Sequence, residues 1–393
     1  MATLTYPTLS EDRKDAQVAD LRPTVDVIRR LPQSAKPTLR VLMSRAKRKP
    51  WGPRMKITQD MFVRAGDAFI GTIHQNFTLD SPNLTTTMEW DPKIIGASKG
   101  ISVYERESYT DSGVSQFDKA MELTIAAYEG CTTSLNFSCW AGFNTTSTNT
   151  EGTPGAEAIG GEISLDSFDP ANPGNKITGA ATEALRYESI PFAIRNYSTT
   201  QTNAYTYGGI SISSTTDNVN FQSKIIEGNG STITYGTSGR LLGIPTRIQN
   251  PETFSKDLLE ELLQAIQVGP GYELLIAMPP AIYSSAVDVL FPQMRGTADR
   301  PLKDLGINAS VTWEEYNAIL YADPTLTSMW PTSIWAWDTS CLFLCLHPRF
   351  APYVWPWQSV GFSTDLGFSM AFWGNLINVC PPATGVIHGV QAA

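Results

Sequence analysis

The sequence predicts an α+β fold, and three features of the 393-residue chain carry that prediction. Two runs rich in β-branched and aromatic residues, Phe62–Phe77 and Leu84–Ile95, flank a turn signal and predict a hairpin with long arms. Apolar residues at steps of three and four across residues 113–140 predict a long amphipathic helix. Helix, strand and helix signals then follow one another between residues 253 and 291, which indicates mixed packing within one chain.

The overall composition is that of a globular protein with many loops. Apolar residues make up 42% of the chain, and charged residues only 17%, against a usual value of about 25%. No run of about 18 apolar residues occurs, so we expect no membrane-spanning helix, and Met1–Ser10 lacks the pattern of a secretory signal. The odd number and wide spacing of the cysteines favour reduced, buried thiols at Cys131, Cys139, Cys341, Cys345 and Cys380.

Positive charge is concentrated near the N-terminus. Residues 1–56 contain 13 Lys and Arg against 5 Asp and Glu, whereas residues 57–393 contain 16 against 33. Residues 1–55 also contain six prolines and little periodicity, so we expect an extended basic arm with at most a short helix at Val25–Arg30. Such an arm attracts either the acidic body of another copy or nucleic acid. Removing residues 1–50 is expected to leave the body folded.

The hairpin and the long helix are the clearest elements of the first half. The hairpin turn is expected at Leu79–Asn83, and a further strand near Ile101–Arg106. Asp111 or Ser112 is suited to cap the helix, and Gly142 lies just past its end. The apolar stripe of this helix consists of Val114, Phe117, Met121, Ile125, Tyr128, Cys131 and Leu135.

The middle of the chain changes from extended to mixed signals. Residues 189–226 are expected to be extended. A helix at 253–267, a buried strand at 273–278 and a helix from 279 to about 291 come next.

The C-terminal part is rich in strand signals and aromatic residues. The apolar run Cys341–Leu346 predicts a strand buried on both faces. Seven of the ten tryptophans lie between residues 311 and 390: Trp313, Trp330, Trp335, Trp337, Trp355, Trp357 and Trp373. Packing in a core or an interface is favoured for them over a sugar-binding platform.

No set of residues has the spacing of a catalytic or metal site. The three histidines, none with a second ligand at metal-binding spacing, are His74, His347 and His388. Cys341 and Cys345 have the wrong spacing for a metal or redox motif and favour core packing. Three carboxylates lie early in a predicted helix, where the helix dipole favours negative charge: Asp257, Glu260 and Glu261. We therefore expect neither an enzyme nor a bound cofactor or metal.

The order of these elements resembles the major capsid proteins of tailed phages, which have the Hong Kong 97-type fold. Five phrases in the same order strengthen the resemblance: Thr87–Trp90, Tyr207–Ser211, Asp323–Thr339, Trp373–Leu376 and Pro381–Gly389. One departure is Ile212-Ser213, where those proteins usually carry Arg-Ser.

The resemblance implies a division of the chain and a role for each part. The parts are a basic N-terminal arm (1–55), the E-loop hairpin with the first P-domain strands (56–110), a P-domain spine helix (111–142), mainly A-domain (143–340) and a strand-rich return to the P-domain (341–393). The implied function is self-assembly, through hexamers and pentamers, into an icosahedral shell enclosing double-stranded DNA, without catalysis or cofactor. The implied location is the virion, after assembly in the host cytoplasm.

The resemblance also indicates what the chain contacts. The arm of such proteins lies along neighbouring subunits, which favours arm-to-body contact over DNA binding. The candidates for contact between subunits are Arg45, Lys47, Arg48, Lys49 and Arg54. The other expected partners are packaged DNA, bound without sequence specificity, and scaffolding, portal and decoration proteins; no membrane is expected.

Two alternatives stay open at this point. The first is a nanocompartment shell of the same fold that encloses an enzyme. The second, of a different class, is a β-rich carbohydrate-binding surface protein, which the absence of a signal pattern disfavours.

Overall fold

The computed structural model describes residues 36–50, 56–62, 85–102, 116–140, 157–158, 187–194, 205–212, 222–235, 245–266, 273–290, 302, 307, 309–349, 352–359 and 366–393. The chain divides into two compact units. Unit 1 contains Ile94–Leu135 and Arg349–Trp373, and unit 2 contains Ala35–Lys93, Asn136–Pro348 and Gly374–Ala393. Both units combine helix and strand, so the predicted α+β class is confirmed.

The centre of unit 2 is a six-stranded sheet with the order β13-β14-β12-β15-β19-β8. In that order its strands are Ser310–Trp313, Ala318–Ala322, Leu274–Met278, Ser333–Asp338, Thr384–His388 and Lys224–Glu227. Every residue of β12, β14, β15 and β19 is buried. Strands covered on both faces have continuous apolar sequences, and the predicted buried strand at 273–278 is confirmed as β12.

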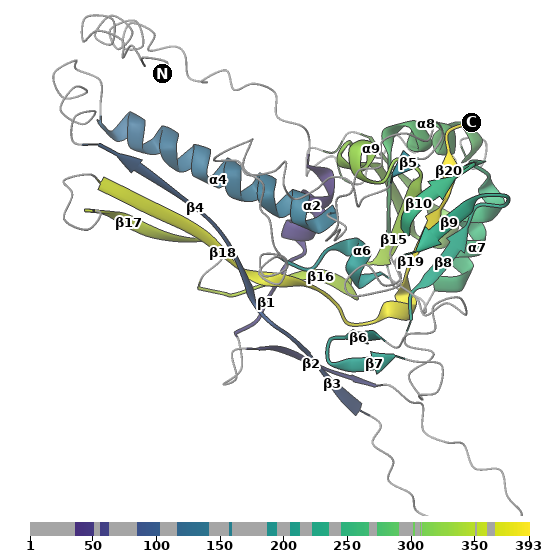
Figure 1. Cartoon of the computed structure of the whole chain (residues 1–393), viewed down its shortest axis with the longest axis horizontal. Helices are drawn as coiled ribbons and strands as arrows, with labels where there is room; N and C mark the ends of the chain where they lie inside the picture. The colour runs from purple at the N-terminus through teal and green to yellow at the C-terminus, as the bar shows by residue number, and fades with distance from the viewer. Residues whose placement is uncertain are drawn as a thin grey trace, which may run out of the picture. The chain divides into compact units, whose positions relative to one another are not determined.

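Two helices lie beside this sheet, α7 (Lys256–Ile266) and α8 (Pro280–Leu290), as Figure 1 shows. α7 contacts β19 and β8, and α8 contacts β14. Leu259, Leu262, Leu263 and Ile266 recur at helical spacing and enter one apolar core with the strands. Both predicted helices are confirmed. α7 begins three residues later than predicted because Glu252–Thr253 form strand β11, which pairs with β20 (Val390–Gln391).

A second sheet has the order β1-β16-β18-β17, and β4 also pairs with β18. In that order its strands are Lys47–Arg48, Leu342–Leu346, Leu366–Asn378 and Tyr353–Ser359, with Lys93–Ile101 as β4. Strand β18 has residues in both units: β16 pairs with its residues 374–378, and β17 with its residues 366–371. All five residues of β16 are buried, which confirms the predicted strand.

Unit 1 is built from helix α4 and the strands that pair with the first part of β18. The predicted long helix is confirmed as α4 (Gln116–Trp140), whose residues up to Leu135 belong to this unit. Tyr128 packs its ring against Phe372 of β18, with 6.0 Å between centroids. Of the predicted stripe, Cys131 and Leu135 are buried, but Tyr128 is 44% exposed and lies at the margin of the packed face.

The base of the predicted hairpin is present in unit 2. Strand β2 (Ile57–Phe62) pairs antiparallel with β3 (Thr85–Trp90), from Ile57 opposite Trp90 to Phe62 opposite Thr85. The first strand therefore begins five residues before the predicted run. The second run is interrupted at Asp91-Pro92, since proline has no N–H for a sheet ladder, and the chain continues as β4 in another sheet.

The region predicted to be extended contains a helical turn. Ser189 caps helix α6 (Ile190–Ala193), because its hydroxyl accepts the N–H of Phe192 at 3.2 Å and proline follows within the first turn. Strands β6 (Tyr205–Tyr207) and β7 (Ile210–Ile212) then form a tight hairpin. The shorter elements are α2 (Pro37–Ser44), α9 (Thr325–Met329), η5 (Glu314–Tyr316), η6 (Pro381–Ala383), β5 (Glu157–Ala158), β9 (Thr232–Tyr235) and β10 (Pro245–Gln249).

Several predictions concern residues outside the described ranges. They are the helix at Val25–Arg30, the hairpin turn at Leu79–Asn83, and the capping residues of the long helix, Asp111, Ser112 and Gly142. Across the described part of the chain, no helix is both long and apolar enough to cross a membrane.

Candidate assembly site

The end of the basic arm is folded onto unit 2, and we call residues 36–50 the docked segment. Pro37 occupies the first turn of α2, where its missing N–H costs nothing. Leu39, Val41 and Leu42 are at most 3% exposed, so this helix buries an apolar face. This differs from the expected extended arm: the arm sequence has few apolar residues, but these three lie at helical spacing and pack on the body of their own chain.

A buried carboxylate holds the first turn of the docked segment. Asp323 follows β14, and its Oδ2 accepts a hydrogen bond of 2.5 Å from the Thr38 hydroxyl and one of 3.1 Å from Trp140 Nε1. Its Oδ1 accepts the backbone N–H of Thr325 at 2.9 Å, which starts helix α9. Donors of this kind offset the cost of burying a carboxylate. Asp323 therefore joins α2, the last residue of α4 and α9 at one point.

Asp323 and the groups around it are buried: Thr38 and Tyr321 are fully buried, and Cys139 is 1% exposed. The Tyr321 hydroxyl lies 2.9 Å from the Thr38 hydroxyl. Burial, with the nearby charge of Asp323 as the next cause, raises the pKa of Tyr321 well above its usual range. The same two causes raise the pKa of the Cys139 thiol to about 12. Both groups therefore stay neutral, as hydrogen-bonding and packing groups.

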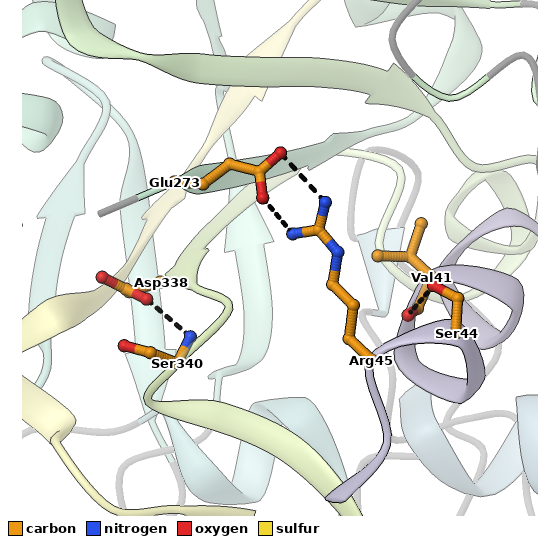
Figure 2. A network of polar contacts seen from close by, with 6 residues as sticks. All are labelled: Val41, Ser44, Arg45, Glu273, Asp338 and Ser340. Atoms are coloured by element: carbon orange, nitrogen blue, oxygen red, sulfur yellow. Dashed lines mark hydrogen bonds and ion pairs between the residues drawn. The ribbon is translucent and has the colours of Figure 1, made fainter. Parts of the chain in front are cut away.

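A forked ion pair holds the C-terminal end of α2, as Figure 2 shows. Arg45 Nη2 donates to Glu273 Oε1 at 2.9 Å, and Nη1 pairs with Oε2 of the same carboxylate. Glu273 directly precedes the central strand β12. Two parallel bonds between guanidinium and carboxylate fix orientation as well as distance. Both side chains are about one-third exposed, which limits the strength of the pair in water.

Beyond α2, the chain adds a strand to the second sheet. β1 pairs in parallel with β16, Lys47 opposite Cys345 and Arg48 opposite Leu346. The Lys47 ammonium lies 3.7 Å from the centroid of the Phe343 ring and donates to the Ser340 carbonyl at 3.0 Å. Lys49 donates to Gln59 Oε1 at 2.6 Å, which connects the segment to the hairpin base.

The structure thus places four of the five predicted contact residues. Arg45, Lys47 and Lys49 contact unit 2 of their own chain. Arg48 projects from β1 as an exposed side chain, and Arg54 lies outside the described residues. The attraction between basic arm and acidic body is therefore satisfied within one chain at Arg45. Contact between subunits remains a prediction for these residues.

Three of the five phrases that carried the resemblance meet at the hairpin base. The rings of Trp90 and Tyr207 lie edge to face, with centroids 6.0 Å apart. The Glu89 N–H donates to the Gly208 carbonyl at 2.9 Å. Gly208 has φ +56°, and a Cβ there would lie 2.7 Å from the Met88 Cε, so conformation and space both require glycine. Asn375 ties the return strand to this base, because its Nδ2 donates to the Asp91 carbonyl at 3.0 Å.

Comparisons with known proteins find a likeness in structure. A scan of family models and a search of curated proteins each return no match. The capsid asymmetric unit of cyanophage A-1(L) matches with a TM-score of 0.56 at 14% identity, covering 94% of this chain and 99% of that chain. The capsid of a native GTA particle matches with a TM-score of 0.51 at 10% identity, covering 94% of each chain.

The chain has the fold of a phage capsid protein. The resemblance inferred from five short phrases is therefore confirmed at the level of the fold, although sequence identity is low. Within this capsid fold, the docked segment and the hairpin base are two places where segments far apart in sequence are joined by specific polar contacts.

Among the C-terminal tryptophans whose side chains the structure describes, Trp313, Trp330, Trp335 and Trp337 are buried, and Trp373 is partly exposed. Trp330, Trp335 and Trp337 are at most 1% exposed, which confirms packing and excludes a sugar platform formed by these three. His388 lies among them, 5.4 Å from the Trp335 ring, with its Nδ1 2.8 Å from the Ser333 hydroxyl. Burial lowers the pKa of His388 to about 3, so it is a neutral structural residue.

Sequence reasoning missed the residues that hold the docked segment. Asp323 was part of a recognised phrase, and an acidic residue two positions before Thr325 is a capping signal that could have been read. Glu273 carries no such signal, because a carboxylate before an apolar strand usually faces solvent. Asn378 was also missed; its Nδ2 donates to the Ala193 carbonyl at 3.1 Å and to Thr384 Oγ1 at 3.1 Å.

Proposed function

We propose that this chain is a major capsid protein that assembles, through hexamers and pentamers, into an icosahedral shell around double-stranded DNA. The observation that carries the proposal is the extent of the structural likeness: 94% of this chain aligns with 99% of a chain from a cyanophage capsid. Since one fold can serve several functions, the basic arm and the five ordered phrases add independent support.

The resemblance assigns a role to each part of the structure. Helix α4 serves as the P-domain spine, and the six-stranded sheet with α7 and α8 forms most of the A-domain. The hairpin that begins at β2 and β3 is the E-loop. The contacts of Trp90, Gly208 and Asn375 support this assignment, since they fix the base of the hairpin on the body.

The docked segment supports a role for the arm in assembly. Asp323, Glu273 and β16 hold residues 36–50, so the chain before Lys36 starts from a fixed point on unit 2. Residues 1–35 contain five basic and five acidic residues, whereas residues 36–56 contain eight basic residues and no acidic one. Positively charged contacts to a neighbouring subunit are therefore expected from residues 36–56, and Arg48 is the exposed candidate on β1.

The direct test is to look for shells. Purified full-length chain, freed of nucleic acid, would be concentrated at low salt and observed by sedimentation and negative-stain electron microscopy. We expect closed particles of uniform diameter. A chain that stays monomeric across salt and concentration, and that binds glycans on an array, would contradict the proposal in favour of the carbohydrate-binding alternative.

The cargo decides between a head shell and a nanocompartment. Particles recovered from producing cells would be treated with nuclease and their contents identified by mass spectrometry and gel staining. Protected double-stranded DNA supports the head shell. A single co-purified enzyme, with no protected DNA, would overturn it.

A further inference from the structure

The chain passes between the six-stranded sheet and the second sheet at two neighbouring crossings, and each crossing carries a cysteine. The first passage leads from β15 of the six-stranded sheet to β16 of the second sheet, and Cys341 lies in it. The return leads from β18 to β19, and Cys380 lies there, next to helix η6. Two cysteines 39 positions apart in the chain thus occupy neighbouring crossings.

The backbone holds both crossings in fixed turns. Asp338 Oδ1 accepts the Ser340 N–H at 2.6 Å, as Figure 2 shows, and the Cys341 N–H donates to the Asp338 carbonyl at 3.1 Å. The Val379 N–H donates to the Cys341 carbonyl at 2.9 Å, so the two crossings are bonded directly to each other. The Cys380 N–H donates to Asn378 Oδ1 at 3.2 Å.

The bond between the crossings brings Cys341 and Cys380 close together, because Cys380 directly follows Val379. Cys341 is 7% exposed, and Cys380 is partly exposed. Hydrogen bonding between the two thiols raises the pKa of Cys341 and lowers the pKa of Cys380. The thiolate, which is the reactive form, is therefore carried by the more accessible partner.

The other three cysteines differ in both respects. Cys131, Cys139 and Cys345 are buried. Burial raises the pKa of Cys131 to about 11 and that of Cys139 to about 12, and it also raises the pKa of Cys345. Among the five cysteines, Cys380 is therefore the partly exposed one, and a second thiol, Cys341, lies at the neighbouring crossing.

We propose that Cys341 and Cys380 are a redox pair that closes an intrachain disulfide by exchange with a low-molecular-weight disulfide. The Cys380 thiolate attacks one sulfur of the reagent and forms a mixed disulfide with that half of the reagent. The other half leaves as a thiolate. Cys341 then loses its proton and attacks the Cys380 sulfur, which releases the second half of the reagent. Two protein thiols lose two electrons, and one reagent disulfide becomes two thiols.

The bond would fasten both crossings between the sheets. It would close the loop from residue 341 to residue 380, which includes β16, β17 and β18, and so restrict the unfolded chain. Neither this geometry nor the test below depends on the proposed shell function. A chain that folds in reducing surroundings and later meets oxidising ones would gain this restraint only after folding.

The test is oxidation of the native full-length chain with oxidised glutathione, followed by alkylation of remaining thiols and peptide mass spectrometry. We expect loss of two of the five free thiols, a linked pair of peptides containing Cys341 and Cys380, and an upward shift in Tm that dithiothreitol reverses. Cys341→Ser should stop at a mixed disulfide between Cys380 and glutathione. Cys380→Ser should react at least ten-fold more slowly and form no link.

The matched control is Cys345→Ser, which removes another thiol of the same strand region. It should form the 341–380 link as the wild type does. Circular dichroism and the Tm of each reduced variant establish that it is folded. A wild-type chain that accumulates only a stable glutathione adduct, or one that links another cysteine pair, would overturn the proposal.

Discussion

The two units of this chain differ in how completely they bury their apolar side chains. In unit 2, four strands of the central sheet are buried at every residue and two helices add to the same core. In unit 1, Ile94, Tyr128 and Val354 are 52%, 44% and 45% exposed. Among the described residues, the other exposed large apolar side chain is Val289 of unit 2, at 39%.

Unit 2 therefore has the more extensive described core, whereas unit 1 exposes more of its large apolar side chains. Single exposed apolar residues are common on soluble proteins. Three on one small unit, built from one helix and a narrow sheet, are better explained by a surface that another subunit covers. That explanation rests on the proposed shell function. The predictions that follow test each side of the comparison.

The largest effect should come from cutting the docked segment away from unit 2. Deleting residues 1–50 removes Thr38, Arg45 and strand β1, whereas deleting residues 1–35 leaves all their described contacts in place. We expect the longer deletion to lower the unfolding free energy by roughly 5 kcal/mol or more, from lost burial and hydrogen bonds. The shorter one should change it by less than about 0.5 kcal/mol.

Urea unfolding followed by tryptophan fluorescence measures both deletions. This prediction replaces the expectation from sequence that the body folds unchanged without residues 1–50. Equal midpoints for the two deletions would show that the docked segment adds nothing to unit 2.

Asp323→Ala should produce the next largest loss. Without the carboxylate, the Thr38 hydroxyl, Trp140 Nε1 and the Thr325 N–H lose a buried acceptor. Each unsatisfied buried donor costs about 1–3 kcal/mol. Because some of the three donors can turn to other acceptors, we expect the unfolding free energy to fall by roughly 3 kcal/mol in total. Asp323→Asn keeps one acceptor oxygen and is the control. A loss below about 0.5 kcal/mol for Asp323→Ala in urea unfolding would contradict this account.

The sequence was most informative where one physical signal dominates. Strand β16 and helix α7 have apolar patterns that match their burial, so their positions were predictable. Strand β3 of the hairpin base lies within its predicted run, whereas β2 shares only Phe62 with the run predicted for it. The end of β3 at Trp90 depends on Pro92 and on the switch of β4 to another sheet.

The site was less predictable because it depends on partners distant in sequence. Thr38 and Asp323 are 285 residues apart, and Arg45 and Glu273 are 228 apart. The charge pattern indicated that basic arm and acidic body attract each other. It could not indicate that Arg45 forms its ion pair within its own chain, since nothing local distinguishes Glu273 from a solvent-facing carboxylate.

The pH dependence of unit 2 should come in part from His388. Its pKa in the folded chain is about 3, below the value of about 6.5 expected when unfolded. The neutral form therefore stabilises the fold above pH 6.5, and this stability is lost as pH falls from 6.5 towards 3. At pH 5 the loss should be roughly 2 kcal/mol.

Urea unfolding at pH 7.5 and pH 5 measures this term. His388→Gln keeps a polar group for Ser333 but removes the titrating imidazole. Between pH 7.5 and pH 5, the unfolding free energy of this variant should therefore fall by roughly 2 kcal/mol less than that of the wild type. His347→Gln, at a partly exposed position, is the control and should keep the wild-type slope. Identical slopes for all three chains would remove His388 from the explanation.

Arg45 and Arg48 provide a matched pair within the docked segment. Arg45→Ser breaks the forked pair with Glu273 and should cost about 1 kcal/mol, since the pair is partly exposed. Arg48→Ser should change the unfolding free energy by less than about 0.5 kcal/mol. If Arg48 contacts a neighbouring subunit, the Arg48→Ser substitution should slow DNA-free assembly measured by light scattering. The slowing should be smaller at high salt, because salt screens the charge. Normal assembly with reduced DNA retention would assign Arg48 to nucleic acid.

The smallest effect on folding should come from the exposed apolar residues of unit 1. Replacing Ile94 and Val354 together with Ser removes side chains that are about half exposed, so we expect a loss of no more than about 0.5 kcal/mol per site in urea unfolding. Assembly should respond far more strongly, because each apolar contact recurs in every subunit of a closed shell. Val289→Ser is the control, because Val289 is an exposed apolar side chain of unit 2. We expect it to leave both folding and assembly close to wild type.

Light scattering at equal protein concentration compares the three chains. Unchanged assembly of the double variant would show that the exposed apolar side chains of unit 1 face solvent in the shell. In that case the difference between the units would describe only how each one folds.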